Sequence, residues 1–209
     1  MTPRSLRDSV GYVLAQMDEL KLSHLPVMDG EKYLGLIAED DLQDSGTETL
    51  LEELQDYFIH SSVQVNDYFL VAVKVAHVMQ IDIVPVMNEK KEMEGVIRQD
   101  SLFRELAHLT GAEEYGSMVV VEMDQKDYSV GDINRLVESN DAIITQLNTW
   151  FDKASHTLTV VLRINKEEIS DIVASFQRHE YTVRYYLGEE LFRNELQSNL
   201  DHLMNYLNI

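Results

Sequence analysis

The sequence predicts an α+β protein in which two copies of a helix–strand–strand–helix unit precede a domain of element order βαββαβ and a terminal helix. Two observations on pattern support this prediction. An internal repeat with an offset of 59 to 60 residues occupies the first half, and the hydrophobic periodicity changes after the glycine-containing stretch 111–116. In addition, the 209 residues are 44% hydrophobic with 9 glycines and 3 prolines, so the chain is expected to bury a core.

Two pairs of segments carry the repeat. His24–Met28 recurs as Ile83–Met87 at an offset of 59, and Gly35–Leu42 recurs as Gly95–Leu102 at an offset of 60. One residue inserted in the turn 88–94 explains the change of offset. The repeat therefore rests on internal evidence, with the same landmarks in the same order in both copies.

Each copy is expected to start with a helix, to continue as a hairpin and to end with a second helix. Asp8 and Asp67 are expected to cap the first helix of their copies. The first helix of the second copy is the more apolar one and is therefore expected to be the more buried. The second helix of each copy is expected to start at Asp40 or Asp100. The hairpins are predicted from these β-rich runs: Leu25–Met28 with Tyr33–Ala38, and Val84–Met87 with Met93–Arg98.

This pattern resembles the cystathionine-β-synthase (CBS) regulatory module, which occurs as a tandem pair. The resemblance covers about residues 3–108, and it places the two CBS repeats at 3–58 and 59–110. It implies a disc of two packed sheets with two clefts, related by a pseudo-twofold, that often bind adenosine-containing ligands. His24, Pro26, Ile83 and Pro85 are candidate cleft residues on this resemblance, with His24 either packed in the core or lining a cleft.

The family also has a Gly-apolar-x-Thr/Ser-x-x-Asp/Asn run at the end of a strand, which holds phosphate at a helix N-terminus and ribose at the acidic residue. The first copy has Ala38 at the hydroxyl position and keeps Asp41 at the ribose position. The second copy has Arg98, a cation suited to phosphate, and Ser101 in place of the acid. The alternative is structural: the polar residues are helix caps, and Arg98 pairs with a surface carboxylate.

The stretch 39–56 holds eight acidic residues and no basic one. One interpretation is a site for a divalent cation or a basic partner. The favoured interpretation is a solvated face, because four leucines in or beside the stretch form an inward-facing set: Leu42, Leu50, Leu51 and Leu54. No metal site is predicted.

The second half is predicted to contain four strands and two helices in the order βαββαβ. After a CBS pair, this order resembles the ACT regulatory domain, which commonly binds an amino acid at the turn after its first strand. In that turn Asp127 and Gly131 are the candidate residues, with Gly131 alternatively a residue of the first helical turn. The expected ranges are a linker at 111–116, the ACT-like domain at 117–190 and an amphipathic helix at 191–209.

Composition excludes several classes of protein. The formal charge of −20 is shared by both halves, so neither a nucleic acid nor an anionic membrane is an expected partner. The absence of cysteine excludes disulfides and thiolate sites. The seven histidines are far apart in the sequence and no nucleotide-binding or nucleophile motif is found, so we expect no enzyme. Without a leader or a spanning segment, a cytoplasmic location is expected.

A CBS pair followed by an ACT-like domain resembles the acetoin-utilisation accessory protein family. The resemblance implies a regulatory protein that binds AMP, ATP or S-adenosylmethionine in a CBS cleft and acts through the ACT-like domain or through oligomerisation, with a homodimer as the expected state. The alternative is a scaffold without a ligand, which works by dimerisation or by docking a protein partner. The changes at Ala38 and Ser101 favour this alternative.

Overall fold

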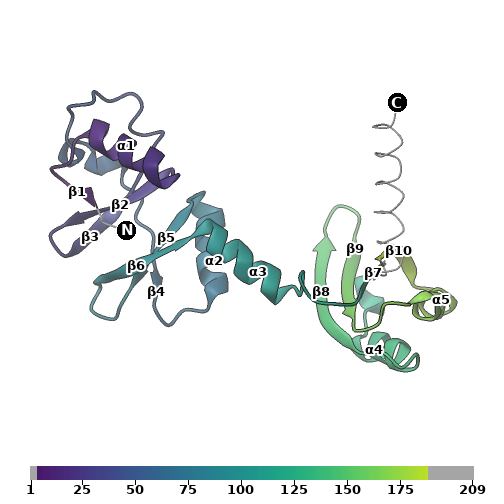
Figure 1. Cartoon of the computed structure of the whole chain (residues 1–209). Helices are drawn as coiled ribbons and strands as arrows, with labels where there is room; N and C mark the ends of the chain where they lie inside the picture. Colours follow the sequence, from purple (N-terminus) through teal and green to yellow (C-terminus); the bar gives the residue numbers. More distant parts are fainter. Residues whose placement is uncertain (1–3, 188–209) are drawn as a thin grey trace, which may run out of the picture. The chain divides into compact units, whose positions relative to one another are not determined.

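The computed structural model describes residues 4–187 and divides the chain into two compact units, Met1–Leu106 and Ala107–Ile209 (Figure 1). The predicted α+β class is confirmed, because both units combine helices with sheets. The helix predicted for 191–209 lies outside the described residues. Each unit is built around a hydrophobic core of its own.

Unit 1 contains two three-stranded sheets with the same topology. In each sheet a short strand pairs in parallel with the first strand of an antiparallel hairpin, giving the orders β1-β2-β3 and β4-β5-β6. The first copy consists of β1 (Arg4–Ser5), α1 (Val10–Leu20), β2 (His24–Asp29) and β3 (Lys32–Ala38). The second consists of β4 (Val63–Gln64), α2 (Phe69–Met79), β5 (Ile83–Met87), β6 (Met93–Arg98) and α3 (Gln99–Leu109).

The two copies also share backbone details. Lys21 and Gln80 end the first helices in the left-handed conformation, with φ of 53° and 54°. The amide after each hairpin donates to the residue before it: Glu39 to the Ser23 carbonyl, and Gln99 to the Asp82 carbonyl, both at 2.8 Å. The internal repeat predicted from the sequence is therefore present as a structural repeat.

The helix predicted to start at Asp40 is wrong. Turns occupy 40–44, and the next helical element is a 3₁₀ helix, η1 (Leu51–Tyr57). Between Ile37 and Leu50 the only large apolar side chain is Leu42, so no apolar stripe exists for a helix to bury. In the second copy, α3 carries several apolar side chains and forms as expected.

Two further expectations about the first helices are also wrong. The N-caps are Ser9 and Tyr68, while the Asp8 and Asp67 carboxylates accept hydrogen bonds from amides three residues earlier and close the turns before the helices. The more apolar helix α2 buries only Ala72 and Ala76, because most of its large apolar side chains point away from the core.

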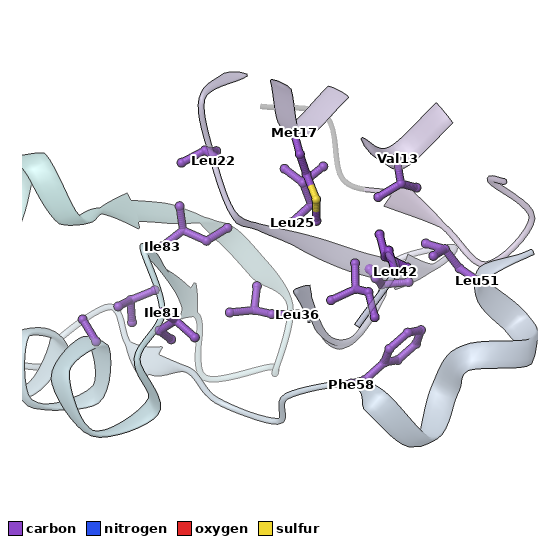
Figure 2. Close-up of a cluster of buried hydrophobic side chains, with 14 of the residues drawn as sticks. Val13, Met17, Leu22, Leu25, Leu36, Leu42, Leu51, Phe58, Ile81 and Ile83 are labelled. Atoms are coloured by element: carbon purple, nitrogen blue, oxygen red, sulfur yellow. The ribbon is translucent and has the colours of Figure 1, made fainter. Parts of the chain in front are cut away.

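The core of unit 1 joins both copies (Figure 2). Met17 of α1 lies over Leu25 of β2, and Val13, Ile81 and Ile83 belong to the same cluster. The acidic stretch contributes three buried leucines to this core: Leu42, Leu51 and Leu54. The inward-facing leucines are thus largely confirmed, although turns and a 3₁₀ helix supply them.

Unit 2 has the βαββαβ order predicted for it. Its antiparallel sheet has the strand order β10-β7-β9-β8, which is the ferredoxin-like arrangement, and α4 packs next to α5. Its core mixes residues of the sheet with residues of both helices. The elements are β7 (Ser117–Asp124), η2 (Gln125–Asp127), α4 (Val130–Glu138), β8 (Ile144–Asp152), β9 (Thr157–Ile164), α5 (Ser170–Arg178) and β10 (Thr182–Leu187).

Candidate functional site

A cavity of about 490 Å³ lies between the two copies of unit 1. Ser23 and His24, at the start of β2, form its wall on the side of the first copy. The second copy supplies the rest of the lining from α2, the start of β5 and α3: Val73, Ala76, His77, Gln80, Ile81, Asp82, Gln99, Leu102, Phe103 and Leu106. Its volume is within the range of small-molecule sites, and its walls are mixed, with apolar helix residues facing polar groups at the strand ends.

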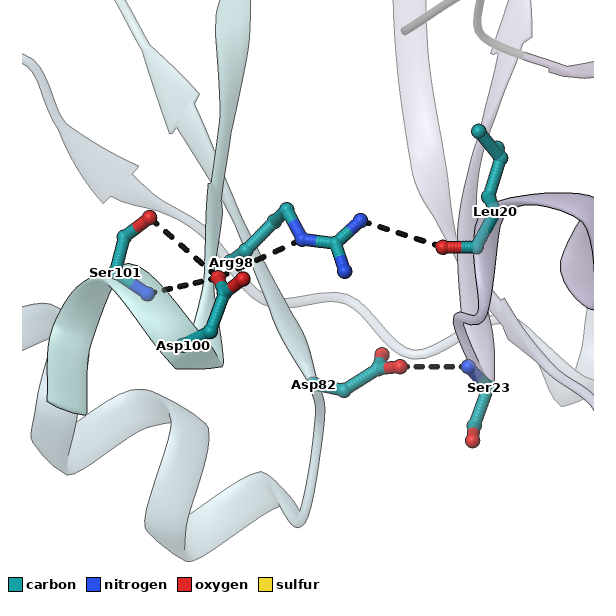
Figure 3. A network of polar contacts seen from close by, with 6 residues as sticks. All are labelled: Leu20, Ser23, Asp82, Arg98, Asp100 and Ser101. Atoms are coloured by element: carbon teal, nitrogen blue, oxygen red, sulfur yellow. Dashed lines mark hydrogen bonds and ion pairs between the residues drawn. The ribbon is translucent and has the colours of Figure 1, made fainter.

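Asp82 links the two copies at this cavity (Figure 3). One carboxylate oxygen accepts a hydrogen bond from the Ser23 amide at 2.6 Å, and the other lies 2.9 Å from the His24 Nδ1. His24 is 8% exposed, so this contact is shielded from solvent. The expectation that His24 is packed or lines a cleft fits its place in the structure, where it does both.

The Asp82 carboxylate is held in its charged form. Burial by itself raises the pKa of this group, but the hydrogen bonds from His24 and the Ser23 amide, together with the charge of a protonated His24, outweigh it. The pKa of Asp82 consequently lies below its ordinary value. At neutral pH the cavity therefore holds a fixed negative charge beside an imidazole.

Arg98 provides a second link between the copies. Its Nη1 donates to the Leu20 carbonyl at 3.4 Å, and its Nε lies 3.5 Å from an oxygen of Asp100, which also accepts from the Ser101 amide at 2.8 Å (Figure 3). Arg98 and Ser101 do not line the cavity. The ion pair between Arg98 and Asp100 is the kind of surface pair that the alternative, structural role of Arg98 predicts.

The other sequence-derived candidates lie apart from the cavity. Ala38 ends β3, opposite His24 in the hairpin, and Asp41 is half-buried in the turns that follow. Pro26, Ile83 and Pro85 are buried within β2 and β5. Sequence reasoning missed Asp82, Gln99 and Leu102, although Asp82 was detectable as the residue that the repeat aligns with Ser23.

In unit 2, Asp127 lines a separate cavity of about 490 Å³. Its polar wall holds three more carboxylates, from Glu122, Asp124 and Glu180. Gly131 does not line this cavity: it is the second residue of α4, behind the N-cap Ser129, which agrees with its alternative interpretation as a helical residue. Within residues 4–187, no cluster of three or more potential ligands is arranged to hold a metal ion.

Comparison with known proteins identifies part of unit 1. Residues 5–46 match the family model of the CBS domain, which confirms the resemblance for the first copy. The matched segment contains α1, β2 and β3 together with Ser23, His24, Ala38 and Asp41. None of the helices described here combines the length and apolar character needed to cross a membrane.

Solved structures similar to the chain include several CBS domain pairs. A CBS domain pair/ACT domain protein from Thermotoga maritima is 17% identical, with a TM-score of 0.44 over 51% of this chain and 89% of its own. The CBS domains of a transcriptional regulator from Streptococcus pneumoniae are 15% identical, with a TM-score of 0.43 over 49% and 86%. CBSX2, solved in complex with AMP, is 15% identical, with a TM-score of 0.44 over 52% and 89%.

Proposed function

We propose that the protein is a regulatory sensor that binds a small adenosine-containing ligand in the cavity between the two copies of unit 1. The observation that carries this proposal is the composition of the cavity wall, in which Ser23 and His24 of the first copy face Asp82 and Gln99 of the second. A ligand that contacts both copies interacts differently with each of their arrangements, and so it can shift the equilibrium between them. The CBS match of residues 5–46 supports the ligand class.

Helix α3 is the proposed route of output. Gln99, Leu102 and Leu106 line the cavity, and the same helix continues to Leu109, beyond the boundary between the units at Leu106. A displacement of α3 by the ligand is therefore passed along the backbone to the start of unit 2. We propose that unit 2 is an ACT-like output domain, and that the chain belongs with the acetoin-utilisation accessory proteins that it resembles.

Thermal shift measurements on the full chain with AMP, ADP, ATP and S-adenosylmethionine test the proposal. A ligand present at 100 times its dissociation constant stabilises the folded state by about 2.7 kcal/mol. His77→Trp places a large ring at the cavity wall and is expected to abolish the shift. Lys74→Trp makes a similar change one turn earlier on α2, outside the cavity, and is expected to retain it.

Asp41→Ala distinguishes the ribose position expected from the sequence, at Asp41, from the cavity found in the structure. Because Asp41 does not line the cavity, this variant is expected to keep the affinity of wild type. Loss of binding in Asp41→Ala but not in His77→Trp would move the ligand to the turn after β3. No shift with any of the four ligands contradicts the proposed ligand class.

A second candidate function is self-association, which the exposed face of α2 favours. Val71 and Val78 are 41% and 64% exposed, and Leu70, Met79 and the α3 residue Phe103 are also exposed. Apolar side chains gathered on neighbouring helices are typical of an interaction surface. We propose that a second copy of the chain covers this face, giving the homodimer expected from the sequence.

Sedimentation velocity tests the dimer. Val78→Glu places a charge on the apolar face and is expected to convert the dimer to a monomer. Val65→Glu makes the same change at a residue of similar exposure, 54%, that lies outside α2 and α3, and is expected to leave the dimer intact. A wild-type protein that sediments as a monomer at all concentrations contradicts this second function.

A further inference from the structure

A second cavity of unit 1 lies at the turns of the two hairpins and shares no lining residue with the first. An isolated backbone bridge pairs Lys32 with Glu92, so the turn between β2 and β3 lies beside the turn between β5 and β6. The cavity between them has a volume of about 590 Å³. Its lining residues are Glu31, Lys32, Tyr33, Ser62, Gln64, Met87, Lys90, Lys91 and Glu92.

The charge at this cavity is opposite in sign to that of the whole chain. Lys32, Lys90 and Lys91 line it together with two glutamates, a local excess of one positive charge in a protein of formal charge −20. Of the ion pairs found among residues 4–187, none involves these three lysines. Their ammonium groups are thus available to an anion from solution.

The Asn88 side chain makes hydrogen bonds within the longer turn, both to backbone amides and to the carboxylates of Glu92 and Glu94. The side-chain oxygen of Asn88 accepts hydrogen bonds from the amides of Lys90 and Glu92 at 2.9 and 3.0 Å. Its nitrogen donates to the carboxylates of Glu92 and Glu94, both at 2.8 Å. Glu92, one of the two glutamates that line the cavity, is therefore hydrogen-bonded to Asn88 and forms no ion pair with Lys90 or Lys91.

Both hairpin turns of unit 1 contain a residue in the left-handed conformation, Gly30 with φ of 60° in the first and Lys91 in the second. The second hairpin turn adopts a left-handed conformation at Lys91, with φ of 64°, which costs a non-glycine residue free energy. A backbone bond from the Lys91 amide to the Asn88 carbonyl, at 3.0 Å, closes the turn. The second turn thus has a lysine in the left-handed conformation, whereas the first has a glycine.

The remaining lining residues suit a small polar ligand. Met87 is buried and Tyr33 half-buried, and the Tyr33 hydroxyl donates to the Ser61 carbonyl at 3.0 Å. Burial raises the pKa of the Tyr33 phenol well above its ordinary value, so it stays neutral and does not repel an anion. Ser62 and Gln64 add a hydroxyl and an amide as hydrogen-bond donors.

We infer that this cavity binds a small polyanion that carries two or more phosphate groups, with Lys32, Lys90 and Lys91 neutralising its charge and Ser62 and Gln64 donating hydrogen bonds. Three lysines at the two hairpin turns line one cavity, and a single monovalent anion would not neutralise all of them. The volume matches a small molecule. This site is independent of the function proposed for the cavity at Asp82.

Isothermal titration of the full chain with inorganic pyrophosphate at low ionic strength tests the inference. Wild type is expected to bind one pyrophosphate per chain. Lys90→Ala/Lys91→Ala removes two charge-assisted contacts and is expected to weaken binding by about tenfold or more. The control Lys74→Ala/Lys153→Ala removes the same charge from exposed positions outside the cavity and is expected to stay within about twofold of wild type.

Two further results separate this site from others. His77→Trp, which blocks the first cavity, is expected to bind pyrophosphate as wild type does. Equal losses in the two double-lysine variants would show general attraction to surface charge and overturn the site. The absence of pyrophosphate binding by wild type, with its thermal unfolding unchanged from buffer, would overturn it as well.

Discussion

Gly35 and Gly95 occupy the same position in the two copies but differ in their surroundings. A Cβ on Gly35 would lie 2.9 Å from the Phe58 Cβ and 3.2 Å from the Ile59 carbonyl oxygen, whereas at Gly95 it would meet nothing within 4 Å. The segment at Ile59 pairs with Leu36, so it has little room to move aside.

Gly35→Ala is therefore expected to lower the free energy of unfolding of unit 1 by about 1–3 kcal/mol through overpacking. Gly95→Ala, the matched control, is expected to change it by less than about 1 kcal/mol. Urea denaturation followed by far-ultraviolet circular dichroism measures both. Equal effects of the two substitutions would show that the close approach at Ile59 is not decisive.

Asp82 makes the stability of unit 1 depend on pH. Its pKa is lowered in the folded state from an ordinary value of 3.8, so its contribution is fully present above that pH and is lost as the pH falls through the lowered value. Asp82→Asn is expected to destabilise unit 1 at pH 7 by about 1–2 kcal/mol. The difference from wild type should shrink below pH 3.8 in a series of urea titrations. Asp44→Asn makes the same substitution in the acidic stretch, outside the cavity wall, and serves as the control.

At the scale of elements, the N-terminus of α4 offers a direct test of a capping residue. The Ser129 hydroxyl accepts a hydrogen bond from the Asp132 amide at 3.2 Å. Ser129→Ala is expected to lower the stability of unit 2 by about 1 kcal/mol, and Ser129→Asp to retain it, because aspartate accepts the same bond. Fluorescence of Trp150, the single tryptophan, reports on the unfolding of this unit. A stable Ser129→Ala variant would show that the cap contributes little.

Most elements were predictable where apolar periodicity was regular. In unit 2 the predicted order βαββαβ is observed, because apolar residues alternate in strands such as β9 and recur every three or four residues in helices such as α4. The first copy of the repeat shows where prediction from periodicity fails. Its helix at Asp40 was expected only by analogy with Asp100, and the local sequence lacks the apolar stripe that the analogy requires.

The candidate site was predictable only in part. His24 was a candidate on the resemblance to the CBS module, but its partner Asp82 is 58 residues away and no local pattern connects them. The lysines at the hairpin turns were not detected, because total charge averages over positions that folding brings together. Burial and contact between distant segments decide these features, and neither is encoded in local spacing.

At the scale of the whole molecule, the two separate cores predict two independent unfolding transitions. Far-ultraviolet circular dichroism reports on both units, while Trp150 reports on unit 2. The two signals are therefore expected to give different midpoints in urea, and Gly35→Ala is expected to shift only the circular dichroism transition. Coincident midpoints in wild type and in the variant would show that the chain unfolds as one cooperative body.

The contact between Ser23 and Asp82 also reflects the symmetry of the repeat. These residues are equivalent under the offset of 59, as Lys32 and Glu92 are under the offset of 60, so in both places a position of one copy meets its own counterpart in the other. Both contacts use backbone groups: Asp82 accepts from the backbone amide of Ser23, and Lys32 and Glu92 form a backbone bridge. At the first contact the two halves differ in the carboxylate alone, because position 82 has an aspartate where position 23 has a serine.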